Sequence, residues 1–170
     1  MGGMVRATAT FPKDRMSEGV IEFFRDEKLL GSFRCLARSD SSAASAHGNP
    51  TRDPMRPFGD LPAGIYRAIK TIPAADRAAE RRSYGTQPRF VLTPLSGPAL
   101  LSVQRWGLLI HGGDLGRGGA LRPSHGCLRW DDSTAAQVCL WLGEEETFEL
   151  LAIELVPENR HGVLMHSGRF

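Results

Sequence analysis

Short apolar runs, separated by glycine, proline and charged residues, are the main feature of this sequence. The runs Gly19–Phe24 and Leu29–Leu36 flank the turn-like Asp26-Glu27-Lys28, which predicts a β-hairpin. Further runs have the length and composition of strands. They are Ala63–Ile72, Phe90–Leu92, Leu100–Val103, Trp106–Ile110 and Phe148–Val156.

One segment instead has helical spacing. Between Asp131 and Leu142 the apolar positions Ala135, Val138 and Cys139 lie on one face of a helix, after a start rich in capping side chains. A shorter helical turn is predicted at Ala74–Arg82. The expected fold class is therefore mostly β, a sandwich or small barrel with one or two short helices.

The length of 170 residues suits one domain. We expect a flexible N-terminal lead-in at residues 1–16, the folded domain at 17–157 and a C-terminal tail at 158–170. Arg38–Asp60 is long, polar and rich in helix and strand breakers. Segments of this kind are usually functional or disordered, so it is either a mobile flap over a cleft or a disordered insertion.

Composition narrows the range of partners. The net charge is +2 and the basic residues are scattered, so a nucleic-acid partner is not expected. No apolar run approaches the roughly 20 residues of a membrane-spanning helix, and Met1–Pro12 lacks the apolar stretch of a secretory signal. The three cysteines are an odd number, which leaves at least one thiol unpaired.

The residues that carry chemistry are concentrated in Leu108–Asp131. An apolar strand ends at His111, a glycine-rich loop follows, and Ser124-His125-Gly126-Cys127 precedes the predicted helix. A thiol with a pKa of about 8.5 becomes a useful nucleophile beside an imidazole or near a helix N-terminus. We therefore predict that Cys127 is a nucleophile and that His111 is its general base.

Glycine in this motif adds a second expectation. Gly126 permits a positive φ angle or a close approach of substrate to the backbone. The N–H groups of Gly126 and Cys127 are accordingly expected to be free to stabilise a developing oxyanion.

This motif resembles the catalytic motif of the L,D-transpeptidases, the YkuD-type family. The matching residues are His111-Gly112 and, after a loop, Ser124-His125-Gly126-Cys127-Leu128-Arg129. A weaker match is Pro62-Ala63-Gly64-Ile65-Tyr66, which resembles the family's Pro-x-Gly-x-Tyr/Phe segment at the start of a central strand. The resemblance extends over Glu18–Val156 and so makes residues 17–157 an L,D-transpeptidase-like catalytic domain.

The resemblance implies roles for single residues. Cys127 would attack the carbonyl before a terminal D-Ala of a peptidoglycan stem peptide and form a thioester. His111 would be the base, oriented by the backbone carbonyl of Gly112. No cofactor or metal is implied. The residues implied to form the oxyanion and substrate region are Ser124, His125, Gly126 and Arg129. His125 could equally cap the turn, and Arg129 could hold either the motif loop or a substrate carboxylate.

Two positions depart from the family pattern. Gly113 stands where many members have Thr, and Trp130 stands where an aliphatic residue or Asn is common. These departures leave the thiol chemistry unchanged but affect the choice of acyl acceptor. Tyr84 and Trp106 are candidates for a substrate wall, with core packing as the alternative.

The same residues could form other kinds of site. A zinc site could draw on His111, His125, Cys127 and Cys139, but their spacing matches no common zinc motif. Papain-like peptidases present Cys before His, which is the reverse of the order here. A catalytically inactive module that binds wall peptides is a further alternative.

The expected place of action is the periplasm or cell envelope, where stem peptides lie. Because no signal is visible, we expect either a fragment of a longer protein or a small antibacterial effector. The second possibility resembles L,D-transpeptidase-like effectors delivered by type VI secretion, and it would imply an immunity protein as partner.

Overall fold

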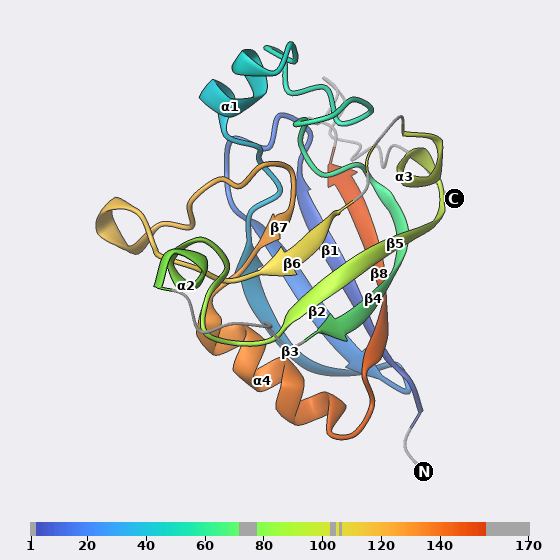
Figure 1. The fold of residues 1–170 in the computed structure, drawn as a ribbon. Helices are drawn as coiled ribbons and strands as arrows, with labels where there is room; N and C mark the ends of the chain where they lie inside the picture. Colours follow the sequence, from blue (N-terminus) through green and yellow to red (C-terminus); the bar gives the residue numbers. More distant parts are fainter. Residues whose placement is uncertain (1–2, 72–77, 103–104, 106, 156–170) are drawn as a thin grey trace, which may run out of the picture.

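A computed structural model describes residues 3–71, 78–102, 105 and 107–155 (Figure 1). Its centre is a strongly curved eight-stranded sheet with the order β3-β2-β1-β8-β4-β5-β6-β7. The strands are β1 (Val5–Pro12), β2 (Gly19–Arg25), β3 (Lys28–Cys35), β4 (Gly64–Thr71), β5 (Arg89–Ser96), β6 (Leu109–His111), β7 (Leu128–Arg129) and β8 (Thr147–Leu155). The described helices are α1 (Ser41–Ala46), α2 (Ala78–Tyr84), α3 (Pro98–Leu101), α4 (Asp132–Leu142) and the 3₁₀ turn η1 (Arg117–Gly119). The predicted mostly β class is confirmed, with more short helices than expected.

Strand β1 corrects the predicted lead-in. Residues 1–16 were expected to be flexible, but Val5–Pro12 pairs antiparallel with β2 and parallel with β8. Val5, Ala7, Ala9 and Phe11 are buried and alternate with more accessible residues. Alanine contributes little to a hydrophobic pattern, so the alternation was easily missed, although a narrow core needs small side chains there. The described residues end at 155, so the predicted C-terminal tail at 158–170 lies outside them.

Most other strand predictions agree with the structure. The hairpin is formed by β2 and β3, and β4 and β8 match the predicted runs up to their last residues, Ile72 and Val156, which lie outside the described residues. Strand β5 is longer than Phe90–Leu92, and β6 begins only at Leu109.

The strand predicted at Leu100–Val103 is wrong in its described part, where the short helix α3 lies instead. Gly97 at its N-cap has a φ of 78°, and Pro98 occupies the first turn, where a missing N–H costs nothing. Val103 is outside the described residues. The apolar run was short, and periodicity alone does not distinguish strand from helix in such runs.

The core lies between the inner face of the sheet and α4 and contains an aromatic cluster. The ring of Phe23 lies 5.3 Å from that of Phe148, 5.9 Å from Trp141 and 6.3 Å from Trp130, centroid to centroid. The predicted helix is confirmed as α4. Asp131 occupies its N-cap, but its carboxylate accepts two hydrogen bonds from Arg34 of β3, at 2.8 and 2.9 Å.

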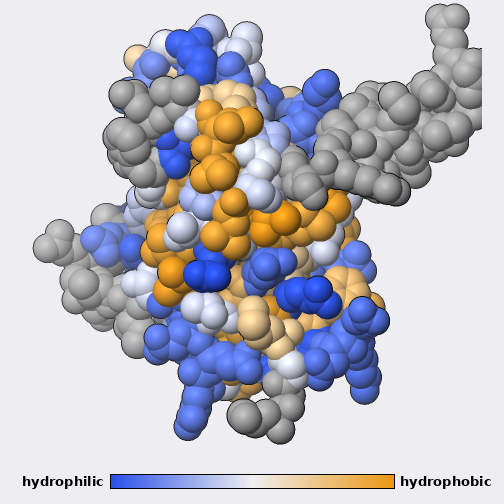
Figure 2. Space-filling view, turned by 90° about the vertical axis from the view of Figure 1, so that its right-hand side faces the viewer, coloured by the Kyte–Doolittle hydropathy of each residue, from blue (hydrophilic) through white to orange (hydrophobic). Residues whose placement is uncertain are grey.

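The opposite, outer face of the sheet carries exposed apolar side chains. Ile69 of β4 and Val91 of β5 are cross-strand partners and are each 38% exposed. Figure 2 views this side of the molecule and shows apolar residues gathered across its middle, with hydrophilic residues above and below. Successive side chains along these strands therefore point alternately into the core and towards this outer surface.

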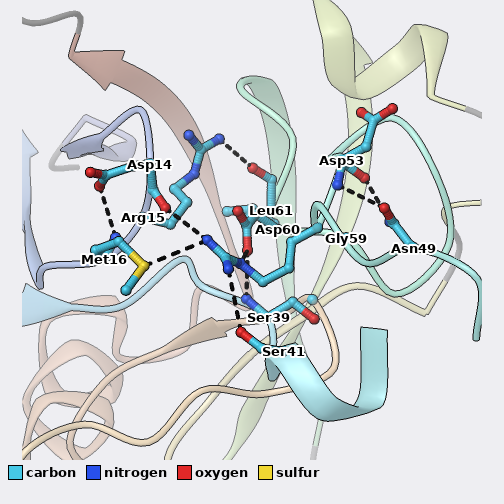
Figure 3. Close-up of polar contacts among 12 residues, drawn as sticks. Asp14, Arg15, Met16, Ser39, Ser41, Asn49, Asp53, Gly59, Asp60 and Leu61 are labelled. Atoms are coloured by element: carbon cyan, nitrogen blue, oxygen red, sulfur yellow. Dashed lines mark hydrogen bonds and ion pairs between the residues drawn. The ribbon is translucent and has the colours of Figure 1, made fainter. Parts of the chain in front are cut away.

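Arg38–Asp60 is folded, so the expectation of a disordered insertion is wrong, while movement as a flap stays a prediction. Helix α1 is followed by turns that side chains stabilise. Asn49 donates to Asp53 O and accepts from Asp53 N–H, and the carboxylate of Asp60 accepts from Ser39 N–H and Arg52 Nε (Figure 3). Because Asn49 and Asp60 are buried, these bonds satisfy groups that would otherwise be costly to bury.

The same segment is joined to the strands beneath it. Arg52 Nη2 donates to Asp14 O at 3.0 Å, and the buried guanidinium of Arg15 donates to Leu61 O (Figure 3). Arg15 also donates to Glu154. These contacts connect the later part of the segment, and Leu61 just after it, to Asp14 and Arg15, which follow β1. Arg15 extends the connection to Glu154 of β8.

Truncation of the aromatic centre should test this description of the core. Phe23→Ala is expected to lower the free energy of unfolding by about 3–5 kcal/mol, because it leaves a cavity among rings that pack on all sides. Phe24→Ala, one residue along and on the partly exposed face of β2, is the matched control and should cost clearly less. Urea unfolding of the three proteins measures the difference, and equal losses would contradict the assigned register.

Candidate active site

Cys127 and His111 are brought together by neighbouring strands. β6 ends at His111, β7 begins just after Cys127, and the two strands pair in parallel, with Ile110 opposite Leu128 and His111 opposite Arg129. Both side chains line one cavity of about 340 Å³. In this resting arrangement Cys127 Sγ donates to Gly107 O at 4.0 Å. The strand pairing thus delivers a thiol and an imidazole to the same cavity.

His111 is held in one tautomer. Its side chain is buried, and Nδ1 lies 2.7 Å from the backbone carbonyl of Gly112. A carbonyl can only accept, so Nδ1 carries the proton and Nε2 has the free lone pair. Burial lowers the pKa of His111 to about 4, and the positive charges of Arg129 and Arg89 act in the same direction. The imidazole is therefore neutral at pH 7 and competent to accept a proton.

An aromatic ring covers this imidazole. The ring of Tyr84, at the end of α2, meets His111 edge-on with centroids 4.9 Å apart. Arg89 Cζ lies 4.4 Å from the centre of the Tyr84 ring, and Arg89 also pairs with Glu80. These contacts help to hold the ring in place. Tyr84 lines the cavity as a substrate wall would, whereas Trp106 lies outside the described residues.

The thiol of Cys127 is partly accessible. Helix α4 begins at Asp132, next to the predicted start at Asp131, and strand β7 lies between it and Cys127. Burial raises the pKa of Cys127, while a backbone hydrogen bond from Leu109 and the charges of Arg105 and Arg129 lower it. The thiol and the imidazole that line this cavity are therefore both neutral at rest.

The other two thiols lie elsewhere. Cys35 is fully buried and its pKa is raised by burial to about 12. Cys139 lies on α4, partly buried, and burial raises its pKa as well. Both are free, and neither lines the cavity of Cys127 and His111.

Ser124 shapes the turn before the nucleophile. Its Oγ accepts from Gly126 N–H at 3.3 Å and from Cys127 N–H at 2.8 Å, and it donates to Cys127 O at 3.0 Å. The predicted free N–H groups at Gly126 and Cys127 are therefore occupied in this structure, and that expectation is wrong. The turn is also joined to the 38–60 segment, because Asp40 N–H donates to Ser124 O at 2.7 Å.

Gly126 is required by its surroundings. Its φ is 114°, and a Cβ at this position would lie 2.6 Å from Arg105 Nη2 and 2.7 Å from Gly59 O. Only glycine combines that backbone conformation with such close packing. The turn formed by residues 124–127, the nucleophile turn, consequently lies directly against Arg105 and the 38–60 segment.

Arg129 holds the loop between the two motif halves. Its side chain is 3% exposed, and Nη2 donates to Asp114 O at 3.0 Å. Arg129 also lines the cavity of Cys127 and His111, together with the arginines Arg82 and Arg122. The sequence left two roles open for Arg129, and the structure contains the bond that corresponds to the first, which is holding the motif loop.

A second cavity, of about 410 Å³, meets the first at Cys127. Tyr84, His125 and Cys127 line both cavities. The exposed His125 lies beside Phe58, with ring centroids 6.0 Å apart, so it lines the cleft. The remaining residues of this second cavity are Pro57, Phe58, Arg105, Gly107, Leu108 and Leu109.

Asp132 is a site residue that the sequence did not single out. Its Oδ1 accepts from Gly113 N–H at 3.3 Å, and a Cβ on Gly112 would collide with its carboxylate. Gly113 has a φ of 133°, and a Cβ there would lie 2.8 Å from Arg82 O. The departure from Thr at this position therefore has a local steric reason. In the sequence, the adjacent glycines Gly112 and Gly113 are the feature that could have indicated such close packing.

Sequence reasoning also missed Arg105 and Phe58. Each stands in a segment without periodicity, and only the folded chain brings it to Cys127. Within the described residues no group of three or more His, Cys, Asp or Glu side chains is arranged to hold a metal ion. No helix in the described part of the chain is long and apolar enough to cross a membrane.

Comparisons with known proteins bear on the fold. No protein-family model matches the sequence, and no curated protein does. The helical cell shape determining protein Pgp2 from Campylobacter jejuni matches in structure with a TM-score of 0.52 and 13% identity, over 97% of this chain and 51% of that one. Bd1075 from Bdellovibrio bacteriovorus has a TM-score of 0.54 and 13% identity, over 87% and 48%.

A third match is L,D-transpeptidase 1 of Mycobacterium tuberculosis, with a TM-score of 0.45 and 13% identity over 92% of this chain and 62% of that one. The chain spans about half the length of Pgp2 and of Bd1075. Identity this low is informative about architecture alone. The structure and these neighbours together show that the chain has the YkuD-type fold.

Proposed function

We propose that this protein is a cysteine-dependent acyltransferase that acts on the L,D bond of peptidoglycan tetrapeptide stems. One observation carries the proposal: a thiol and an imidazole line the same cavity, and the imidazole presents its unprotonated Nε2 because Gly112 O holds Nδ1–H. This is the arrangement that nucleophilic acyl transfer requires. The sequence motif and the YkuD-type fold agree with it.

The first half-reaction forms a thioester. Nε2 of His111 takes the thiol proton as Cys127 Sγ attacks the carbonyl before the terminal D-Ala. The C–N bond then breaks, the imidazolium returns the proton to the departing amine, and free D-Ala leaves. Burial makes both charged forms costly, so proton transfer and attack are expected to be closely coupled.

The second half-reaction releases the acyl group. His111 deprotonates the acceptor, which attacks the thioester carbonyl, and the thiol is restored. An amine of a second stem gives a cross-link, a free D-amino acid gives exchange, and water gives L,D-carboxypeptidase activity. Cys127 lines both cavities, which together offer space for a donor and an acceptor.

Charge in the cavity favours an anionic donor. Arg82, Arg122 and Arg129 line it, against two carboxylates, Asp40 and Asp114. Stem peptides end in a carboxylate, which arginine binds well. The setting that follows is the periplasm or cell envelope, in agreement with the cell-shape role in the name of Pgp2. Delivery as an antibacterial effector, with an immunity protein as partner, stays a prediction that neighbouring secretion and immunity genes would support.

Replacement of the nucleophile tests the proposal directly. Cys127→Ala should reduce D-Ala release from purified tetrapeptide muropeptides to below about one part in 10³, because no other group can form the thioester. Cys139→Ser is the matched control and should retain turnover. Mass spectrometry of the products separates trimming, exchange and dimer formation. Binding of muropeptides without turnover by the wild type would instead favour the inactive wall-peptide module.

The burial of His111 predicts an unusual pH dependence. The neutral imidazole is the active form, and its pKa of about 4 means that protonation removes the base only near that pH. The acidic limb of kcat/KM should therefore have its midpoint near pH 4, below the roughly 6.5 of a solvated histidine. Activity should be retained at pH 5.5. A midpoint at about 6.5 would contradict a buried, neutral His111.

A further inference from the structure

Arg105 is a buried cation beside the nucleophile. Its side chain is 8% exposed and lines the second cavity together with Cys127. Nη1 donates to Arg56 O at 2.8 Å and to Gly59 O at 2.9 Å, and Nη2 donates to Gly126 O at 3.3 Å. One guanidinium therefore joins the end of the 38–60 segment to the residue that precedes the nucleophile.

All three acceptors are neutral carbonyls. Among the described residues, Arg105 forms no ion pair within 4.0 Å, in contrast to the buried Arg15, which pairs with Glu154. Burial lowers the pKa of Arg105, which reflects the cost of keeping its charge away from water. A buried charge without a fixed counter-ion is expensive, and such groups concentrate at functional sites.

The packing of Gly126 fixes the distance between this charge and the turn. A Cβ on Gly126 would lie 2.6 Å from Nη2 and 3.3 Å from Cζ of Arg105, so the guanidinium lies directly against the backbone of the turn. Cys127 is the next residue. The guanidinium is consequently held by three hydrogen bonds against the backbone of the residue that precedes Cys127.

The charge of Arg105 acts on the thiol more than on the base. Arg105 is the first of the two arginines whose charges lower the pKa of Cys127. The charges that lower the pKa of His111 belong instead to Arg129, Arg89 and His125. A cation placed in this way favours the thiolate more than it disfavours the imidazolium formed in the same step.

We propose that Arg105 is a positioning residue that holds the nucleophile turn and supplies the positive charge that stabilises the Cys127 thiolate. The inference rests on the proposed acyl-transfer function, because it makes Arg105 a counter-ion for the thiolate that forms when His111 removes the thiol proton. No new bond is formed to Arg105, and no further reactant is needed.

The pH dependence of thiol alkylation tests the inference without peptidoglycan. Iodoacetamide reacts with the thiolate, and peptide mass spectrometry separates modification of Cys127 from that of Cys35 and Cys139. In Arg105→Gln the midpoint for Cys127 should rise by about one pH unit. In Arg105→Lys, which keeps the charge but loses the forked hydrogen bonds, it should stay within about half a unit of the wild type.

Arg67→Gln removes a positive charge from the exposed outer face of β4 and serves as the control for net charge. It should leave the midpoint unchanged. Thermal unfolding identifies any variant that has lost its fold, and if Arg105→Gln is unfolded, the Lys variant decides. An unchanged midpoint in folded Arg105→Gln, or a rise of a full unit in folded Arg105→Lys, would overturn the inference.

The outcome also separates this inference from the proposed function. If wild-type protein fails to process muropeptides but the alkylation midpoint shifts as described, the acyl-transfer proposal fails while the electrostatic role of Arg105 stands. If muropeptides are processed and the midpoint does not move, the proposed function stands and Arg105 serves the structure of the turn alone.

Discussion

The parallel pairing of β6 with β7 is the constraint from which the rest of the site follows. It involves few residues, Leu109–His111 and Leu128–Arg129, yet it brings the ends of a long glycine-rich loop side by side. His111 leaves one strand and Cys127 enters the other. Trp130 N–H donates to His111 O at 3.1 Å and extends the pairing towards α4. A small shift of either strand would move the imidazole and the thiol apart.

Around this pairing the protein uses backbone carbonyls to hold side chains in place. Gly112 O selects the tautomer of His111, Asp114 O binds Arg129, and Gly126 O binds Arg105. Carbonyls are available here because the loops form little regular structure and leave acceptors unpaired. Glycine at positions 112, 113 and 126 allows these backbones to approach the groups they hold. The geometry of the site thus depends on glycines, which have no side chain to keep the backbone apart from these groups.

Local pattern predicted the elements that have strong periodicity. The β2–β3 hairpin, β4, β8 and α4 follow from runs such as Gly19–Phe24 and from the spacing of Ala135, Val138 and Cys139. The pattern does not predict strand β1, because its inward residues include two alanines. It predicts a strand where α3 lies, because a short apolar run fits both kinds of element. Prediction failed where burial, rather than residue type, decides the conformation.

By itself the sequence determined the order and chemistry of the motif: a histidine at a strand end, a glycine-rich loop, and a cysteine after Ser-His-Gly. Only the tertiary structure decided the electrostatics. It buried His111 and so lowered its pKa, paired the N–H groups of Gly126 and Cys127 with Ser124 Oγ, and brought Arg105 into a cavity that Cys127 lines. Burial and charge depend on contacts between segments distant in the chain, which no local pattern encodes.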